Sequence, residues 1–475
     1  MIKNVKMPIK EFPKPISILK LIGPSFIILA LGLGSGEVIL WPYLVSKYGL
    51  GIIWGAILGI TFQYIMNMEI ERYALARGES IFVGFYRKSK LIPFWFILSS
   101  FVPWIWPGII ASSATIFANL LGFKNSSFVA MLLLVVIGLI LSLGPVLYKT
   151  IETMQRTIIS IGVPTIFVIT VVLAKNVHWE SLANGLVGVG DGYNFLPAGI
   201  SLSAFLAALA YSGAGGNLNL SQSFYVREKG YGMGVYAEKI KGLLYGTSKK
   251  LTLTGTDFEI NKTNLANFKA WWRNINIEHL IVFWFTGAFT ICMLGLLSYI
   301  TAYKNPQATE GIGFLFLEAE AMSQMLFPYA GTFFLLIAGT TLFGTQLGIF
   351  DSTSRIISEN IVLASNGKLK DKYLAKSYFV VLWSQIIAGI FILLSGFNQP
   401  LQLVILAAVL NAFAMFVHVG LTLWVNKTLL HKSIRPGFLR TLGMVLAFLM
   451  YGGFSIYVLL DRFGLLYNIV RLFRL

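Results

Sequence analysis

The stretch that decides the fold is residues 28–37, which read ILALGLGSGE, and its counterpart is residues 207–217, which read AALAYSGAGGN. Each stretch begins as an apolar helix and then reaches a Gly-small-Gly step, Gly34-Ser35-Gly36 in the first and Gly213-Ala214-Gly215 in the second. Each step lies in the middle of a long hydrophobic segment and is followed by a polar residue. Because glycine weakens a helix, the two steps predict helices that are interrupted at membrane depth.

Around these two stretches, hydrophobic segments recur along the whole chain of 475 residues. The sequence is 56% hydrophobic and 12% charged, with a mean hydropathy of +0.74. Segments of about 18 or more apolar residues can cross a membrane as helices, so the sequence predicts an all-α membrane protein with about eleven transmembrane helices. The expected spans are residues 21–46, 51–76, 92–121, 127–148, 157–174, 196–226, 279–302, 328–363, 377–396, 400–425 and 438–460.

The order of the spans predicts two inverted repeats. The two glycine steps fall in the first and sixth spans, which begin five-helix units over residues 21–174 and 196–425. An odd number of spans turns the second unit upside down relative to the first, and transporters built in this way hold their substrate between two discontinuous helices. We therefore expect alternating access around the glycine steps, a cytoplasmic loop at residues 227–275, and an eleventh helix at residues 438–460.

Positive charge is distributed unevenly between the two sides of the predicted membrane domain. The chain has 37 Lys and Arg against 20 Asp and Glu, a formal charge of +17, and 28 of the basic residues fall on one side against 7 on the other. The positive-inside rule then predicts a cytoplasmic N-terminal arm at residues 1–20, a C-terminus outside the cell and a location in the plasma membrane. Topology and anionic lipid explain the charge, so nucleic acid is not an expected partner.

The sequence gives no support for catalysis. Its one cysteine, Cys292, lies inside an expected span, so neither a disulfide nor a thiolate metal cluster is predicted. His178, His279, His418 and His431 lack metal-ligand spacing. Phosphate-binding loops, nucleophile elbows and zinc-protease motifs are absent from the sequence. We expect neither an enzyme nor a cofactor.

Glu37 is the strongest candidate for a binding residue. A charged side chain at the centre of a membrane costs about 3 kcal/mol or more, so we expect it to face the transport pathway. Asn217 supplies a neutral oxygen that suits a cation or a polar solute. The alternative is that the glycines only bring helices together and that Glu37 is a protonated carboxyl bonded across a helix interface. The predicted substrate site comprises Gly34, Ser35, Gly36, Glu37, Gly213, Ala214 and Asn217.

Two charge pairs are candidates for coupling or gating. Asp351 and Arg355 lie four residues apart in an unusually polar span, and Glu69 and Arg72 lie three apart near the cytoplasmic end of the second span. Residues at these spacings meet on one helix face. A structural lock is an equal alternative for Asp351 and Arg355, and an anchoring network is the alternative for Glu69 and Arg72.

Three short motifs lie where a known family carries them. They are Leu21-Ile22-Gly23-Pro24 before the first glycine step, Asn217-Leu218 after the second, and Ala338-Gly339-Thr340-Thr341 with Gly344-Thr345-Gln346 in the eighth span. In these motifs the chain resembles the natural resistance-associated macrophage protein (Nramp) family of metal-ion transporters. The resemblance implies the leucine-transporter fold and metal-ion transport.

The metal ligands of this family are only partly matched. Gly34 stands where the family has an aspartate, Ala214 where it has a methionine and Gly216 where it has a histidine, while a carboxylate appears at Glu37. A thioether favours softer transition metals, so its loss removes the basis for selecting manganese or iron. The resemblance therefore implies a divergent branch, in which Glu37 and Asn217 are the expected metal ligands.

The predicted function is secondary active transport of a divalent metal ion by alternating access. The expected partners are the metal ion and the lipid bilayer, with a proton or a sodium ion as the coupling ion. The alternatives are a sodium- or proton-coupled carrier of a small organic solute such as an amino acid, and a membrane sensor or partner subunit that moves nothing. The sequence leaves the ion and the oligomeric state open.

Overall fold

The computed structural model describes residues 7–18, 21, 23–143, 147–237, 253–305, 311–366, 368–369, 373–397 and 399–462. Over these residues the protein is almost entirely helical, with one two-stranded hairpin of β1 (Val189–Gly190) and β2 (Tyr193–Asn194). Ten helical spans among them, one of which joins two shorter helices, are long and apolar enough to cross a membrane. The prediction of an all-α, multi-pass membrane protein is confirmed. Parts of the expected N-terminal arm, cytoplasmic loop and C-terminal tail fall outside the described residues.

The first five spans are present close to their expected positions. A short helix, α4 (Ile81–Lys88), connects the second and third spans, and the third is divided at residues 105–107. The spans are α1 (Pro24–Gly32) with the π-helix η3 (Leu33–Leu40) and α2 (Trp41–Tyr48), then α3 (Trp54–Arg77), α5 (Ile92–Trp104) with α6 (Gly108–Leu121), α7 (Ser126–Leu143) and α8 (Leu147–Leu173).

Helix one, which is α1, η3 and α2 together, differs from the expectation. The predicted unwound break is wrong, because Leu33–Leu40 form a π-helix that joins α1 to α2 without interruption. A π-helix adds a residue to each turn and widens the helix, and such segments are frequent at functional sites. Single glycines separated by larger residues have therefore loosened this helix without ending it. Helix one is also the most enclosed of the ten spans, because 94% of its most apolar 18-residue stretch is buried inside the protein.

The second half of the chain supplies six further spans. They are α10 (Leu202–Ala210) with the 3-10 helix η5 (Gly216–Ser221) and α11 (Gln222–Lys229), then α12 (Lys262–His279) with the π-helix η8 (Leu280–Phe285) and α13 (Thr286–Thr301), α15 (Ala330–Ala364), α16 (Leu374–Leu394), α17 (Pro400–Leu429) and α18 (Phe438–Arg462).

Helix six, which is α10, η5 and α11, is interrupted where the sequence predicts. The chain leaves the helix at Tyr211 and re-enters a helical turn at Gly216, and Gly215 and Gly216 have φ angles of 74° and 56°. Left-handed φ angles of this kind favour glycine. Because of this interruption, helix six is not one of the ten spans counted above. Adding it gives the eleven spans that the sequence predicts.

Helix seven, which is α12, η8 and α13, begins at Lys262, well before the expected start at residue 279. The chain between Trp271 and Phe285 contains neither glycine nor proline, so nothing in it ends the helix. The N-terminal arm is held against α12, because the Phe12 amide donates to Asn264 Oδ1 at 3.1 Å.

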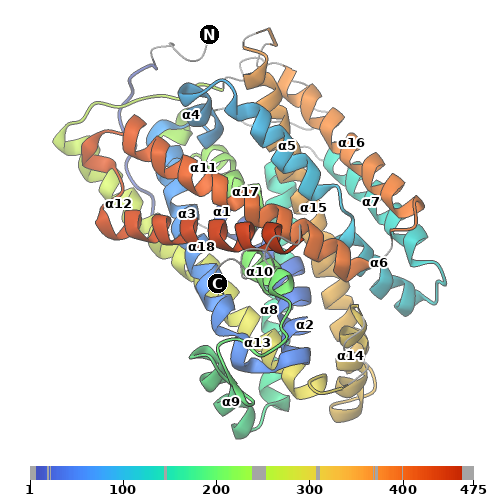
Figure 1. Cartoon of the computed structure of the whole chain (residues 1–475). Coiled ribbons are helices and arrows are strands. Elements are labelled where there is room, and N and C mark those ends of the chain that lie inside the picture. The colour runs from blue at the N-terminus through green and yellow to red at the C-terminus, as the bar shows by residue number, and fades with distance from the viewer. Residues whose placement is uncertain are drawn as a thin grey trace, which may run out of the picture.

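Short elements lie at the two ends of the helix bundle. Figure 1 places α9 (Asn176–Leu186) and α14 (Gly313–Met325) at its lower end, and α4 at its upper end. In the sequence, α9 and α14 belong to connections with few basic residues and α4 to one of the basic connections, so the observed arrangement agrees with the predicted alternation.

Candidate substrate site between helices one and six

Helices one and six touch through their glycine steps. A Cβ atom on Gly32 would lie 2.5 Å from the carbonyl carbon of Gly213, and one on Gly36 would lie 1.6 Å from the carbonyl oxygen of Tyr211. Both distances are too short for any side chain. Close packing therefore accounts for these glycines, and a binding role depends on the polar atoms beside them.

Helix eight (α15) supports the π-helix through one hydroxyl group. Thr345 Oγ1 accepts a hydrogen bond from the Gly34 amide at 3.0 Å and donates one to the Ala30 carbonyl oxygen at 2.7 Å. A Cβ on Gly34 would lie 2.5 Å from the same hydroxyl oxygen. The glycine at residue 34 therefore allows Thr345 to reach two backbone groups of helix one.

The backbone exposed by the break in helix six is bonded by side chains of neighbouring helices. Gln63 of α3 donates to the Ala210 carbonyl oxygen at 3.0 Å and accepts from the Gly215 amide at 3.1 Å. Nε2 of His418, on α17, lies 3.1 Å from the carbonyl oxygen of Gly216. Unwound backbone at membrane depth requires such partners. His418 thus supports the break in helix six.

Glu37 lies fully buried on the π-helix of helix one. Neither of its carboxylate oxygens has a hydrogen-bond partner, and the same holds for the hydroxyl of Ser35, also buried. A Cβ on Gly287 would lie 3.5 Å from Glu37 Oε1, so the carboxyl group points towards α13. A buried carboxylate without a partner is strongly unfavourable, so this group is either protonated or compensated by a cation.

Asn217 points in another direction. Its Nδ2 donates to the hydroxyls of Ser99 at 2.8 Å and Ser100 at 2.9 Å on α5, and its Oδ1 has no partner. Gly213 and Ala214 lie in the break, where they contribute backbone atoms. The structure thus brings the two glycine steps together, while the contacts of Glu37 and Asn217 lie on different helices.

The part of the chain that the structure describes contains no group of three or more His, Cys, Asp or Glu residues placed to hold a metal ion. A cation at this site would therefore meet one carboxylate and otherwise neutral oxygen atoms. Such donors suit hard or partly hydrated cations.

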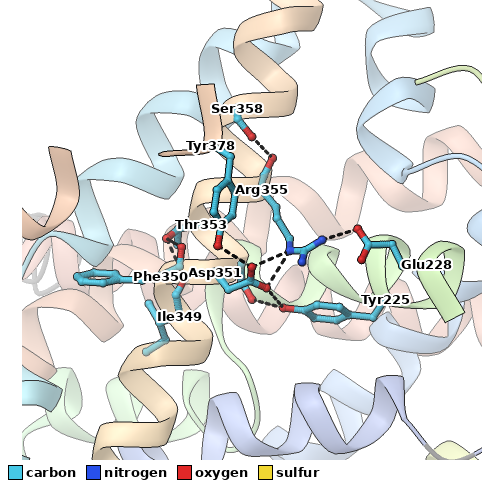
Figure 2. Close-up of polar contacts among 10 residues, drawn as sticks. Tyr225, Glu228, Ile349, Phe350, Asp351, Thr353, Arg355, Ser358 and Tyr378 are labelled. Carbon is cyan, nitrogen blue, oxygen red and sulfur yellow. Dashed lines mark hydrogen bonds and ion pairs between the residues drawn. The ribbon is translucent and has the colours of Figure 1, made fainter. Parts of the chain in front are cut away.

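The predicted pairing of Asp351 with Arg355 is present and belongs to a larger buried network, which Figure 2 shows. Arg355 Nε lies 2.8 Å from both carboxylate oxygens of Asp351, and the guanidinium also pairs with Glu228 of α11. The phenol of Tyr378 donates to Asp351 Oδ1 at 2.8 Å, and that of Tyr225 donates to Oδ2 at 3.2 Å. The network links α15, α16 and the second half of helix six.

The predicted pair of Glu69 and Arg72 is also formed. Arg72 reaches both carboxylate oxygens of Glu69, at 2.8 and 3.0 Å, and donates to the Ile434 carbonyl oxygen at 3.1 Å. Its guanidinium carbon lies 3.9 Å from the ring centre of Trp272, and Asn426 of α17 donates to Glu69 Oε2 at 3.1 Å. This pair therefore ties α3 to α12 and α17. Its role in gating stays a prediction.

Several residues that bond the site were not identified from the sequence. Gln63 begins a polar stripe with Asn67 and Glu71 at a spacing of four in the second span, and helical spacing alone could have revealed it. Ser99 and Ser100 carry no comparable signal, because serine is common in membrane helices.

Comparisons with known proteins were made by sequence and by structure. No protein-family model and no curated protein matches the chain. Two mutants of the manganese transporter of Eremococcus coleocola superpose with a TM-score of 0.66 at 11% identity, over 98% of both chains. The same transporter in complex with an aromatic bis-isothiourea substituted compound gives 0.63 at 12% identity over 99% of both chains. Mhp1, a nucleobase-cation-symport-1 family transporter, gives 0.53 at 12% identity over 94% of both chains.

These similarities establish the fold. The expected Nramp-like architecture of the leucine-transporter type is confirmed, and the chain has the fold of secondary transporters. At 11–12% identity the likeness carries the fold alone, so the substrate has to be argued from the site.

Proposed function

We propose that this chain is a secondary transporter that carries a divalent metal ion across the membrane by alternating access around helices one and six. The observation that carries the proposal is Glu37, a fully buried carboxyl with two unpartnered oxygens, on a π-helix packed against the break of helix six. Sharing the fold of a manganese transporter supports a cation as the substrate.

The donor atoms favour a hard divalent cation. The carboxylate of Glu37 supplies the negative charge. The unpartnered hydroxyl of Ser35 and the backbone carbonyl oxygens at the helix-six break supply neutral oxygen donors. Asn217 is directed towards α5, so it takes part through a bridging water. The chain has no thioether or imidazole at the corresponding positions 214 and 216, which favours magnesium, calcium or manganese over softer metals.

The two repeats are proposed to be residues 21–174 and 196–425, with the N-terminus in the cytoplasm, the C-terminus outside and the plasma membrane as the location. With this orientation, Asp351 and Arg355 bind the cytoplasmic half of helix six to helix eight through Glu228. Movement of that half of helix six must break this network or carry helix eight with it. A gating role for the pair follows, together with a stabilising one.

The proposal is tested with purified protein in liposomes that enclose a metal-responsive dye. Uptake of manganese, magnesium and calcium is compared with and without an inward pH gradient and an inward sodium gradient. We expect saturable uptake of at least one of the three, reduced at least tenfold in Glu37→Gln. The matched control is Glu318→Gln, which also removes a buried carboxyl but lies in α14 outside the site, and it should transport normally.

Two results would contradict the proposal. Normal uptake with unchanged apparent affinity in Glu37→Gln would remove Glu37 from the substrate site. No uptake of any of the three metals under any gradient would exclude divalent-cation transport.

A coupled carrier of a small organic solute is the second candidate. Trp104 stacks on Tyr211 at the break of helix six, with ring centres 5.5 Å apart and an interplanar angle of 9°, and the indole Nε1 has no partner. A flat aromatic surface with a free donor suits a planar solute, and Mhp1 was solved with bromovinylhydantoin bound. Uptake of such a solute that is driven by sodium and is insensitive to metals would select this candidate.

A further inference from the structure

Two helices on the proposed cytoplasmic side of the helix-six break each carry a buried carboxyl group, and the two groups act on one another's charge. Glu71 of α3 is 2% exposed and Glu278 of α12 is 4% exposed. One oxygen of Glu71 accepts from Gln222 of α11, and the Ser25 hydroxyl of α1 lies 2.5 Å from Glu278 Oε2. The other oxygen of each carboxyl has no hydrogen-bond partner. Neither residue belongs to the substrate site described above.

The groups that face this pair are a third carboxyl, a phenol and basic side chains. Lys229 Nζ lies 2.6 Å from Glu152 Oε1 of α8, and its charge also acts on Glu278. The pKa of Tyr231 is raised, first by burial and then by the negative charges of Glu278, Glu71 and Glu152. All three carboxyls therefore act on one phenol, and Lys229 acts on both Glu152 and Glu278.

An imidazole adjoins the pair on α12. His279 is fully buried, its Nδ1 lies 2.8 Å from the Ser25 hydroxyl and its Nε2 has no partner. The ring stacks on Tyr64 and faces the charge of Arg440 of α18. Because Arg440 opposes a second positive charge here, the carboxyls are the better proton acceptors in this cluster.

Two buried carboxylates that repel one another cannot both stay ionised without a compensating charge. The described residues contain no group of three or more His, Cys, Asp or Glu side chains placed to hold a metal ion, so a proton is the simplest compensating ion. Water entering from the cytoplasm would hydrate both carboxylates and remove the need for that proton. Glu71 joins α3 to α11 through Gln222, and Glu278 joins α12 to α1 through Ser25, so each carboxyl lies where one of the two candidate-site helices meets a neighbour.

We infer that Glu71 and Glu278 form a proton-binding pair, whose protonation allows the cytoplasmic side of the pathway to close and whose ionisation accompanies its opening. The inference takes the existence of this pathway from the proposed function. It does not depend on which substrate is moved or on whether the proton is itself transported.

The inference is tested by cysteine accessibility, without any metal. Cys292→Ala provides the background, and Ser223→Cys on α11, next to Gln222, places a fully buried thiol near the pair. The matched control is Ala266→Cys on an exposed position of α12. Protein in lipid nanodiscs is labelled with a charged maleimide from pH 6 to pH 8. Dividing the rate at residue 223 by the rate at residue 266 removes the pH dependence of thiol reactivity.

We expect the normalised rate at residue 223 to fall about tenfold from pH 8 to pH 6, because protonation closes the pathway. Glu71→Gln and Glu278→Gln imitate the protonated pair and should label slowly at every pH. A normalised rate that does not depend on pH in the Cys292→Ala background would overturn the inference without need of the variants. An unchanged pH dependence in both glutamine variants would overturn it as well. Failure of metal uptake in liposomes would refute the proposed substrate and leave the labelling result unaffected.

Discussion

Glu318 offers a quantitative test of the structure that is separate from transport. Its side chain is 1% exposed in α14, which lies between helices seven and eight and outside the ten spanning helices. Burial raises its pKa from 4.5 to about 8, and a hydrogen bond with Ser298 offsets part of the rise. Replacing Glu318 with glutamine removes the titrating group and keeps the size of the side chain.

The sign of the effect follows from proton binding. Between pH 4.5 and about 8 the folded protein holds a proton on Glu318 that the unfolded chain has released, so the stability conferred at low pH is lost as the pH rises. The loss is about 1.4 kcal/mol per pH unit, or about 3 kcal/mol between pH 5 and pH 7. Above pH 8 this group contributes no further change.

The measurement is the thermal unfolding midpoint in detergent at pH 5, 6, 7 and 8, for the wild type, Glu318→Gln and Glu320→Gln. Glu320 is the matched control, since it lies exposed on the same helix. The midpoint of the wild type relative to Glu318→Gln should fall by several degrees between pH 5 and pH 7, and Glu320→Gln should follow the wild type. If the wild type and Glu318→Gln keep a constant difference across this range, Glu318 is not buried as the structure has it.

Two further substitutions test the contacts around helix six. Gln63→Leu should lower the free energy of unfolding by about 2–6 kcal/mol, because it leaves the carbonyl of Ala210 and the amide of Gly215 without partners, at about 1–3 kcal/mol each. An unchanged thermal unfolding midpoint would show that water replaces the side-chain amide of Gln63. Arg355→Met should lower the free energy of unfolding by about 3–5 kcal/mol, because it leaves the buried carboxylates of Asp351 and Glu228 without their cation. Adding Asp351→Asn and Glu228→Gln to this variant should restore much of the thermal unfolding midpoint. No recovery in the triple variant would mean that Arg355 stabilises the fold through packing.

The helices could be predicted because their length and apolar content are properties of short stretches of sequence. Residues 126–143 illustrate this, since they form one of the ten spanning helices where residues 127–148 were expected. The start of helix seven could not be predicted from hydropathy, because Lys269 and Arg273 are charged and lie in the part of the chain that was assigned to the cytoplasmic loop at residues 227–275. The helix continues there because its apolar face, with Phe268 and Trp271 each 2% exposed, packs on the protein.

The residues of the candidate site could be identified in part, but their directions could not. Glu37 stands out in the sequence because it is a charge in an apolar span. Glu37 lies within a π-helix, which adds a residue to a turn, and each added residue rotates the following side chains by about 100°. Ordinary helical periodicity therefore does not say that Glu37 faces α13. The spacing of Gln63 marks it as one of a polar stripe, but the partners of Gln63 and His418 could not be predicted, because both bond backbone atoms that only an unwound helix exposes.

The shared Gly-small-Gly pattern has two structural outcomes, and the residue that follows each step explains the difference. After the second step comes Gly216, whose φ of 56° is left-handed and where a Cβ would lie 1.9 Å from Asn411 Oδ1. After the first step comes Glu37, within a helix that keeps its backbone bonds. Consecutive glycines at residues 215 and 216, together with partners for the freed backbone, therefore unwind helix six, whereas single glycines only widen helix one. The two repeats thus contribute different chemistry to one site: helix one presents a carboxyl side chain from an intact helix, and helix six presents backbone atoms that lie outside a regular helix.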